Sequence, residues 1–561
     1  MKVKPIIYQL LPRLFTNPCN SCIPRGTIAE NGVGKINSID HKVLRSLKQL
    51  GVTHVWYTGI IEHATCTSYA ARGIEPCNPH VVKGQAGSPY AIIDYYDVDP
   101  DLAVSVKHRM AEFESLVART HDAGMKVIID FVPNHVARQY HSDSKPEGVE
   151  DLGENDDNTM FFSPNNNFFY ITGQPFAPGV DMGKGKTAYV ENPARATGND
   201  CYNASPGKND WYETVKLNYG IDPWNGHRHF RPVPSTWHKM LHILQFWADK
   251  GVDGFRCDMA HMVPVEFWHW AIEQVKAAHP AIIFIAEIYD PALYRSYIYD
   301  GGFDYLYDKV TLYDTLFNTL KHNASASHIT QCWQSVDDIK EHMLNFLENH
   351  DELRIASPQF CGDAMLAIPA VVVSATMSTC PFMVYAGQEL GEPALDAEGY
   401  SGRDGRTTIF DYWSMPTVRT WYAGGKCSVA GLTAAQKSLR RFYQRLLRLC
   451  NSEAAISQGA FFDLMYVNNH SLNAHDHFAY LRHHKGETIL VVANFGNETA
   501  HLCVNIPQHA FDCLGLPCGD QRCTELLTDA TMTQSLQPDR PFVVTVPAHN
   551  AVMWKMTPVV K

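Results

Sequence analysis

The chain has 561 residues, of which 45% are hydrophobic and 19% charged, and its formal net charge is −12. This length exceeds one ordinary core, so we expect two or three domains, and the composition excludes a disordered chain. The negative charge, without a long run of lysine or arginine, argues against a nucleic-acid-binding surface.

Short apolar segments alternate with amphipathic ones along most of the chain. The amphipathic segments 38–51, 106–124 and 235–251 carry apolar residues at helical spacing, and each ends at or just before a glycine. The apolar segments predict eight strands, at 4–12, 52–59, 125–132, 252–259, 281–289, 303–308, 343–351 and 380–388. Eight strands joined mostly by helices predict an α/β fold, a closed parallel (β/α)8 barrel.

Two parts of the sequence depart from this alternation. Residues 136–225 are polar and rich in Asn, Gly, Pro and Asp, too long for a simple loop, and from about 453 the pattern becomes that of antiparallel strands with Gly, Asn and Pro turns. We therefore expect a first part of the barrel at 1–135, an inserted domain after the third strand at 136–225, the rest of the barrel at 226–452, and a C-terminal antiparallel β-sandwich domain at 453–561.

The fifteen cysteines are scattered without a repeating frame, which favours free thiols in a reducing compartment. The N-terminus begins MKVKPIIYQLLPRLF, whose apolar run is short and interrupted, so it indicates a first strand rather than a signal peptide. No segment is long and apolar enough to span a membrane. We expect a cytoplasmic protein with no membrane partner; the oligomeric state stays open.

The segment GVDGFRCDMAHM, 251–262, places Arg256 and Asp258 two apart in an otherwise apolar strand. Side chains alternate along a strand, so both point to one side, which faces the barrel mouth at the strand's carboxyl end. We expect Arg256 to orient Asp258, lower its pKa and keep it ionised, as a nucleophile requires. A purely structural ion pair is the alternative from this stretch alone.

Three other predicted strands also end in polar groups. The segments are DFVPNH with Asn134 and His135, AEIYD with Glu287, and FLENHD with His350 and Asp351. The carboxyl ends of barrel strands meet at one face, so these segments predict three carboxylates around one mouth.

The four segments DFVPNH, GFRCDMAHM, AEIYD and FLENHD, in this order, resemble the conserved regions of the α-amylase superfamily, glycoside hydrolase family 13. The resemblance covers the barrel, the inserted domain and the C-terminal domain. It implies Asp258 as nucleophile, Glu287 as general acid/base and Asp351 as the third carboxylate. It also implies that Arg256 supports Asp258, that His135 and His350 hydrogen-bond the sugar, and that Tyr90 in SPYAIIDYYDVDP stacks on it.

These roles fit retaining cleavage of a glycosidic bond, which uses two carboxyl groups about 5 Å apart, one ionised and one protonated. The resemblance thus implies an enzyme that hydrolyses α-1,4 bonds of α-glucans or maltooligosaccharides through a covalent glycosyl-enzyme. A 4-α-glucanotransferase or another transglycosylating member is the alternative. Two further alternatives are a non-catalytic carbohydrate-binding relative and an unrelated metal-dependent barrel enzyme.

Many family members hold a calcium ion near the inserted domain, and Asn134 matches one of its ligands. In ETVKLNYG, however, Lys216 stands where the family has an acidic ligand. A lysine ammonium cannot bind calcium, but it can replace the ion's charge by bridging to Asn134 and nearby carbonyls. We therefore expect no required cofactor and a weak or absent calcium site. After the nucleophile the chain has His261 and Met262 instead of the Lys-His pair of many starch-degrading members, which argues against classical starch specificity and leaves room for short maltooligosaccharides or for transfer.

Overall fold

The computed structural model describes residues 3–394 and 399–559, and its centre is a closed barrel of eight parallel strands. This confirms the predicted fold class. Around the barrel the strand order is β1, β2, β5, β10, β11, β12, β13, β14. Their bounds are β1 Ile6–Leu10, β2 His54–Tyr57, β5 Lys126–Phe131, β10 Gly254–Cys257, β11 Ile283–Ala286, β12 Tyr305–Tyr307, β13 Met343–Phe346 and β14 Phe382–Tyr385.

Large side chains from the strands fill the barrel interior. A buried cluster there includes Ile7, Trp56, Ile128 and Ile285, one from each of four strands. Gly254 at the start of β10 makes room for this layer, because a Cβ atom at its position would lie 2.6 Å from the side chain of Ile283. The barrel is therefore packed below its mouth.

Helices cover the outside of the barrel. Asp40 caps α3 by accepting from the backbone N–H groups of Lys42 and Val43, and Gly51 ends the helix in a left-handed conformation, φ 112°. The longer helices are α3 His41–Leu50, α4 Arg109–Asp122, α5 Ser235–Asp249, α6 Val265–Ala278, α7 Tyr294–Tyr299, α8 Asp314–His322, α9 His328–Ser335, α10 Ile368–Thr376, α11 Pro416–Tyr422, α12 Ala434–Ser452 and α15 Gln508–Leu514. Four-residue helices are α1 Pro12–Phe15, α2 Ile28–Asn31, α13 Ala454–Ser457 and α14 Met465–Asn468.

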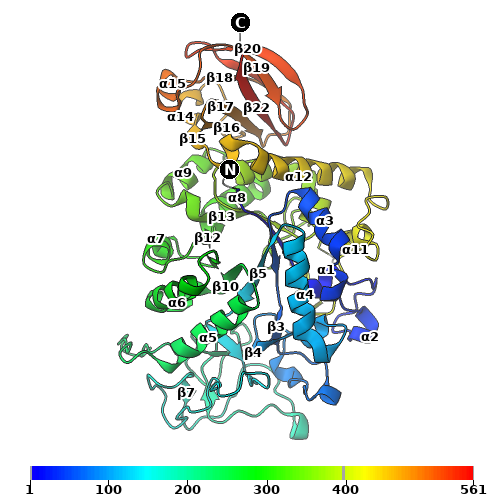
Figure 1. Ribbon diagram of the computed structural model, residues 1–561, viewed down its shortest axis with the longest axis vertical. Coiled ribbons are helices and arrows are strands. Elements are labelled where there is room, and N and C mark those ends of the chain that lie inside the picture. Colours follow the sequence, from blue (N-terminus) through cyan, green and yellow to red (C-terminus); the bar gives the residue numbers. More distant parts are fainter. Residues whose placement is uncertain (1–2, 395–398, 560–561) are drawn as a thin grey trace.

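Between β5 and α5 the chain forms mostly turns and short antiparallel pairs. Strand β6 pairs with β9, and β7 with β8; before them β3 pairs with β4. The bounds are β3 Ile61–His63, β4 Ile92–Val98, β6 His135–Ala137, β7 Tyr170–Ile171, β8 Ala194–Arg195 and β9 Thr214–Lys216. Figure 1 shows this segment at one end of the molecule and the C-terminal strands at the other.

The C-terminal part contains a six-stranded sheet in the order β15-β16-β17-β22-β19-β20 and a two-stranded sheet of β18 and β21. The bounds are β15 Ala460–Asp463, β16 His477–His484, β17 Glu487–Asn494, β18 Ala500–Val504, β19 Gly519–Glu525, β20 Thr531–Leu536, β21 Phe542–Val546 and β22 Asn550–Pro558. Neighbouring strands in both sheets are antiparallel, as the alternating pattern predicts.

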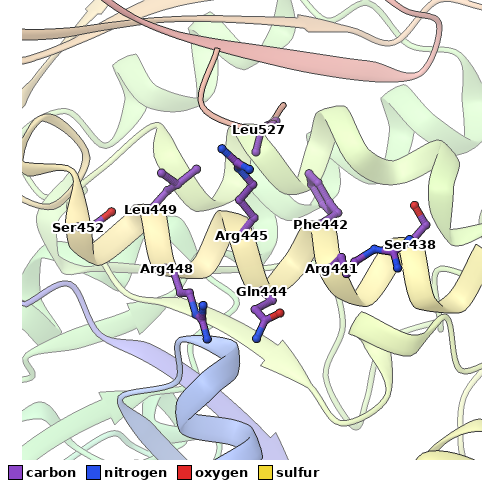
Figure 2. A pocket seen from close by; sticks show the side chains of 9 residues that line it. All are labelled: Ser438, Arg441, Phe442, Gln444, Arg445, Arg448, Leu449, Ser452 and Leu527. Atoms are coloured by element: carbon purple, nitrogen blue, oxygen red, sulfur yellow. The ribbon is translucent and has the colours of Figure 1, made fainter. Parts of the chain in front are cut away.

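Helix α12 connects the barrel to the C-terminal sheet (Figure 1). Figure 2 shows its arginines directed to different sides: Arg445 toward Leu527, and Arg448 away from it. Arg445 donates to both carboxylate oxygens of Asp529, and Arg448 donates to the carbonyl of Gln49 at 2.7 Å. Arg445 thus binds helix α12 to the C-terminal part, and Arg448 binds it to the end of α3. The two arginines do not converge on one ligand position.

Among the helices of residues 3–394 and 399–559, none combines the length and apolar character that a bilayer crossing requires.

Candidate active site

The carboxyl ends of the barrel strands surround a cavity of about 360 Å³. Asp258 directly follows β10, Glu287 directly follows β11, and Asp351 follows β13 at a distance of a few residues. All three carboxylates line the cavity, together with Tyr90 and His135. The structure therefore brings the three predicted carboxylates to one space.

The guanidinium of Arg256 lies beneath two of these carboxylates. Its Nη1 lies 2.7 Å from Asp258 Oδ1, and its Nη2 lies 2.7 Å from Glu287 Oε1. The first contact is an aligned hydrogen bond, whereas the second is an ion pair without that alignment. Since one guanidinium touches both groups, they lie well within the ~9.5 Å upper separation of glycosidase carboxyl pairs.

Arg256 also approaches a third carboxylate. Its Nη1 lies 3.5 Å from Asp130 Oδ1, and the indole of Trp56 donates to Asp130 Oδ2 at 3.0 Å. Arg256 is fully buried, so one cation neutralises several carboxylates in a region that excludes water. The register of the barrel produces this contact, because Arg256 on β10 pairs directly with Asp130 on β5.

The pKa of Asp258 depends on more than its contact with Arg256. Burial raises the pKa of Asp258 well above its ordinary value; Arg256 opposes this shift, while Glu287 and Asp351 add to it. Arg256 acts in the predicted direction, but the expected net lowering of the pKa of Asp258 was wrong because it left out the loss of water and the two other carboxylates.

Glu287 is held by donors on both oxygens. The hydroxyl of Tyr289 donates to Oε1 at 2.6 Å, and the backbone N–H of Met259 donates to Oε2 at 2.9 Å. Met259 has a φ of 43°, a left-handed conformation that is unfavourable for a side chain of this size. The strained backbone after Asp258 thus directs an N–H group at the neighbouring carboxylate.

His350 lies behind the cavity rather than in its wall. Its Nε2 lies 2.9 Å from Asp351 Oδ2 and 2.6 Å from the hydroxyl of Tyr90, and Gln9 contacts its Nδ1. Burial acts to raise the pKa of Asp351, but His350 and two arginines outweigh it and lower this pKa to about 2. His350 therefore holds two cavity groups in place and keeps Asp351 ionised.

Of the predicted substrate-binding residues, Tyr90 and His135 line the cavity, whereas Arg256 and His350 support groups that do. Residues that the sequence analysis did not assign complete the wall: Lys83, Ser88, Trp211, Glu213, Thr214, Met259, Tyr289, Ile409 and Phe410. Tyr289 had a usable signal, because strand alternation places it on the same side as Glu287. Trp211, whose ring lies 5.3 Å from that of His135, comes from the irregular segment and had none.

The residues around Asn134 do not fit a calcium ion. The ammonium of Lys216 binds Asn134 Oδ1, lies 2.7 Å from Asp200 Oδ1 and donates to the carbonyl of Met262 at 3.2 Å. Three oxygens that are suitable calcium ligands thus surround a cation of the protein itself. In the described part of the chain, no three His, Cys, Asp or Glu side chains form a group that could hold a metal.

Comparison with known proteins agrees with this geometry. Residues 9–456, from the first strand of the barrel to the last helices before the C-terminal sheet, match the family model described as alpha amylase, catalytic domain. The chain belongs to the alpha-amylase family.

Relatives within the alpha-amylase family carry several names. An alpha-1,4-glucan:maltose-1-phosphate maltosyltransferase of Mycolicibacterium smegmatis is 25% identical over 75% of this chain, which spans 49% of that protein's length. A cyclomaltodextrinase of Thermoanaerobacter pseudethanolicus is 22% identical over 89% of this chain and 71% of its own. The chain therefore spans about half the length of the maltosyltransferase and more of the cyclomaltodextrinase.

Solved structures support the same fold. A maltogenic alpha-amylase from Thermotoga neapolitana superimposes with a TM-score of 0.64 at 20% identity, covering 100% of both chains. An alpha-amylase from Geobacillus thermoleovorans, solved with acarbose, gives 0.62 at 17% identity over 99% of each chain. These likenesses extend through the C-terminal sheet.

Proposed function

We propose that this protein is a retaining glycoside hydrolase that cleaves α-1,4-glucosidic bonds in α-glucans or maltooligosaccharides. The observation that carries the proposal is the contact of Arg256 with both Asp258 and Glu287 at the cavity floor. Two carboxyl groups that contact one guanidinium, in the wall of a cavity that Tyr90 also lines, can supply the nucleophile and the acid/base of a double displacement.

In this mechanism Asp258 attacks the anomeric carbon while Glu287 protonates the departing oxygen. Burial raises the pKa of Asp258 in the free protein, so the bound substrate has to favour the ionised form of this carboxyl. The positive charge that develops on the sugar favours the Asp258 anion beneath it. Glu287 then deprotonates a water molecule, which releases the sugar from Asp258 with its original configuration.

Transfer to a second sugar is the alternative within the same mechanism. Tyr289, which donates to Glu287, offers an aromatic ring beside the leaving-group position on which an acceptor sugar can stack. A sugar hydroxyl held there would replace water in the second step. Products longer than the starting maltoheptaose would identify transfer.

The test uses maltoheptaose with wild type, Asp258→Asn and Glu287→Gln. We expect each variant to lose at least about 10³-fold in kcat while its melting temperature stays close to that of the wild type. A 5-fluoro-α-glucosyl fluoride should leave a covalent sugar on Asp258, detectable by peptide mass spectrometry. Unchanged turnover by Asp258→Asn, or label on another residue, would refute the proposal.

We also propose that the enzyme needs no calcium and works in a reducing compartment such as the cytoplasm. Lys216 supports the first point because its ammonium already binds the oxygen of Asn134. The cysteines support the second: none of the fifteen, all in the described residues, forms a disulfide.

A further inference from the structure

The hydroxyl of Tyr289 contacts the carboxyl group that the proposed mechanism uses as acid/base. It donates to Glu287 Oε1 at 2.6 Å, and both residues line the cavity. The ring of His261 stands edge-on beside the ring of Tyr289, with the two centroids 6.4 Å apart. The tyrosine is therefore held against Glu287 in the wall of the space that takes the substrate.

Three groups contact the carboxyl oxygens of Glu287, and Tyr289 differs from the other two. The backbone N–H of Met259 donates to Oε2, and Nη2 of Arg256 lies 2.7 Å from Oε1. The guanidinium also contacts Asp258, so it acts on both members of the carboxyl pair. The hydroxyl of Tyr289 has Glu287 as its hydrogen-bond partner among the described residues, and it is the contact that a side-chain substitution removes without touching Asp258.

Tyr289 remains a donor at every pH at which the protein works. Burial, together with the nearby Glu287 and Asp351, raises the pKa of Tyr289 well above its ordinary value. Its hydroxyl therefore keeps its proton. Such a donor binds a carboxylate more strongly than it binds a neutral carboxyl group, so the contact favours the ionised form of Glu287.

We propose that Tyr289 is a positioning residue for Glu287, whose carboxyl group it orients and whose negative charge it stabilises as the proton leaves. In the first step the proton of Glu287 moves to the glycosidic oxygen and the bond from that oxygen to the anomeric carbon breaks. The electron pair of the O–H bond stays on Glu287, where the hydroxyl of Tyr289 meets it. The same anion then accepts a proton from water. This inference rests on the proposed function and adds the group that adjusts its acid/base.

The hydroxyl should influence the pH at which activity is lost on the basic side. Cleavage needs protonated Glu287, and a contact that favours the ionised form lowers the pH at which this proton is lost. Tyr289→Phe should therefore move the basic limb of kcat/KM to higher pH, by about one pH unit for one hydrogen bond to a charged group. The variant leaves unchanged the other titratable or charged side chains near Glu287: Arg256, Asp258, His261, Tyr307 and Asp351.

A second readout uses the leaving group. Maltoheptaose has a sugar leaving group that must take a proton, whereas α-maltosyl fluoride releases fluoride as an anion without one. We expect Tyr289→Phe to lose about tenfold in kcat/KM on maltoheptaose at the wild-type pH optimum, and less than about twofold on the fluoride. Tyr289→Leu, which also removes the ring, should show the same shift of the basic limb.

The matched control is Tyr299→Phe. Tyr299 is exposed, and its hydroxyl donates to the carbonyl of Asp338 outside the cavity wall, so this variant should keep the wild-type pH profile on both substrates. Tyr289→Phe removes a single oxygen from a half-buried side chain, and its melting temperature shows that it is folded.

Three outcomes would overturn the proposal. They are an unshifted basic limb in Tyr289→Phe, equal losses on maltoheptaose and on the fluoride, and wild-type behaviour of Tyr289→Phe beside an impaired Tyr289→Leu. The last would assign the role to the ring rather than to the hydroxyl. Each of them leaves the proposed function intact, whereas a wild type that cleaves neither substrate would overturn both.

Discussion

Arg256 is the residue on which the carboxylate cluster depends. It is fully buried and contacts Asp130, Asp258 and Glu287, so it offsets part of the cost of keeping these groups from water. It does not lower the pKa of Asp258 overall, since burial and the other carboxylates dominate. Its role is to hold the carboxyl groups of Asp258 and Glu287 in fixed positions relative to each other.

His135 provides a test of protonation at the cavity wall. Burial, together with Lys216 and Lys83, lowers the pKa of His135 to about 3. The unfolded chain, whose histidine titrates near ~6.5, therefore binds a proton first as the pH falls. The stability that neutral His135 contributes is fully present above pH ~6.5 and is lost progressively between pH ~6.5 and about 3.

We predict that His135→Asn flattens the pH dependence of the unfolding free energy in this window. The wild type should lose about 2 to 3 kcal/mol more than the variant between pH ~6.5 and ~4.5, by the linkage of pKa and stability. Urea unfolding at several pH values measures this difference. The exposed His141 supplies the control His141→Asn, which should keep the wild-type slope. An unchanged slope in His135→Asn would contradict the prediction.

At the scale of elements, the pairing of β6 with β9 places a lysine where a metal would otherwise bind. His135 pairs with Lys216 in the register, so the side chain of Lys216 starts next to Asn134. Its ammonium is largely buried and binds oxygens from Asn134, Asp200 and the carbonyl of Met262, which lies beyond β10. The ammonium of Lys216 thus links the irregular segment to the barrel, where a bound metal ion would otherwise supply the positive charge.

We predict that Lys216→Asp converts this point into a calcium-dependent one. The substitution removes the ammonium and adds a carboxylate to oxygens that already converge, which is the ligand type that calcium prefers. Its melting temperature should fall without calcium, rise when millimolar calcium is added, and fall again with excess chelator.

The wild type should show the same melting temperature and activity in calcium and in chelator. Lys216→Met serves as the control, because it removes the ammonium without adding a ligand and should stay unresponsive to calcium. Loss of wild-type activity in chelator would contradict the proposal that Lys216 takes the place of calcium.

At the scale of the whole molecule, the fifteen cysteines differ in their exposure to solvent. Cys503, Cys513 and Cys518, all in the C-terminal part, are exposed. Others are shielded: burial raises the pKa of the Cys77 thiol to about 12 and that of Cys66 to about 11. Because the thiolate is the reactive form, these groups should react slowly in the folded protein.

We predict that a thiol reagent such as Ellman's reagent modifies these three exposed cysteines rapidly in the native protein. The remaining thiols should react only slowly, and all fifteen should react in denaturant. A reductant should leave activity and melting temperature unchanged. Fewer than fifteen reactive thiols in denaturant without reductant would reveal a disulfide and contradict this prediction.

The sequence by itself determined the barrel and the positions of the three carboxylates. Each strand is a short apolar run, and each carboxylate follows its run directly or within a few residues, so the pattern is contained in a few neighbouring residues. Strand alternation and the common direction of barrel strands then bring Asp258, Glu287 and Asp351 to one mouth. Tyr289 follows from the same rule, although the sequence analysis did not apply it.

Only the tertiary structure decided which groups face the substrate and how they are charged. Lys83, Glu213 and Phe410 line the cavity although more than a hundred residues separate each from the next, and His350 contacts Asp351 and Tyr90 without lining the cavity itself. The pKa of Asp258 likewise reflects burial and carboxylates from other strands. Long-range packing fixes such contacts and the loss of water around them, and no local pattern of residues records either.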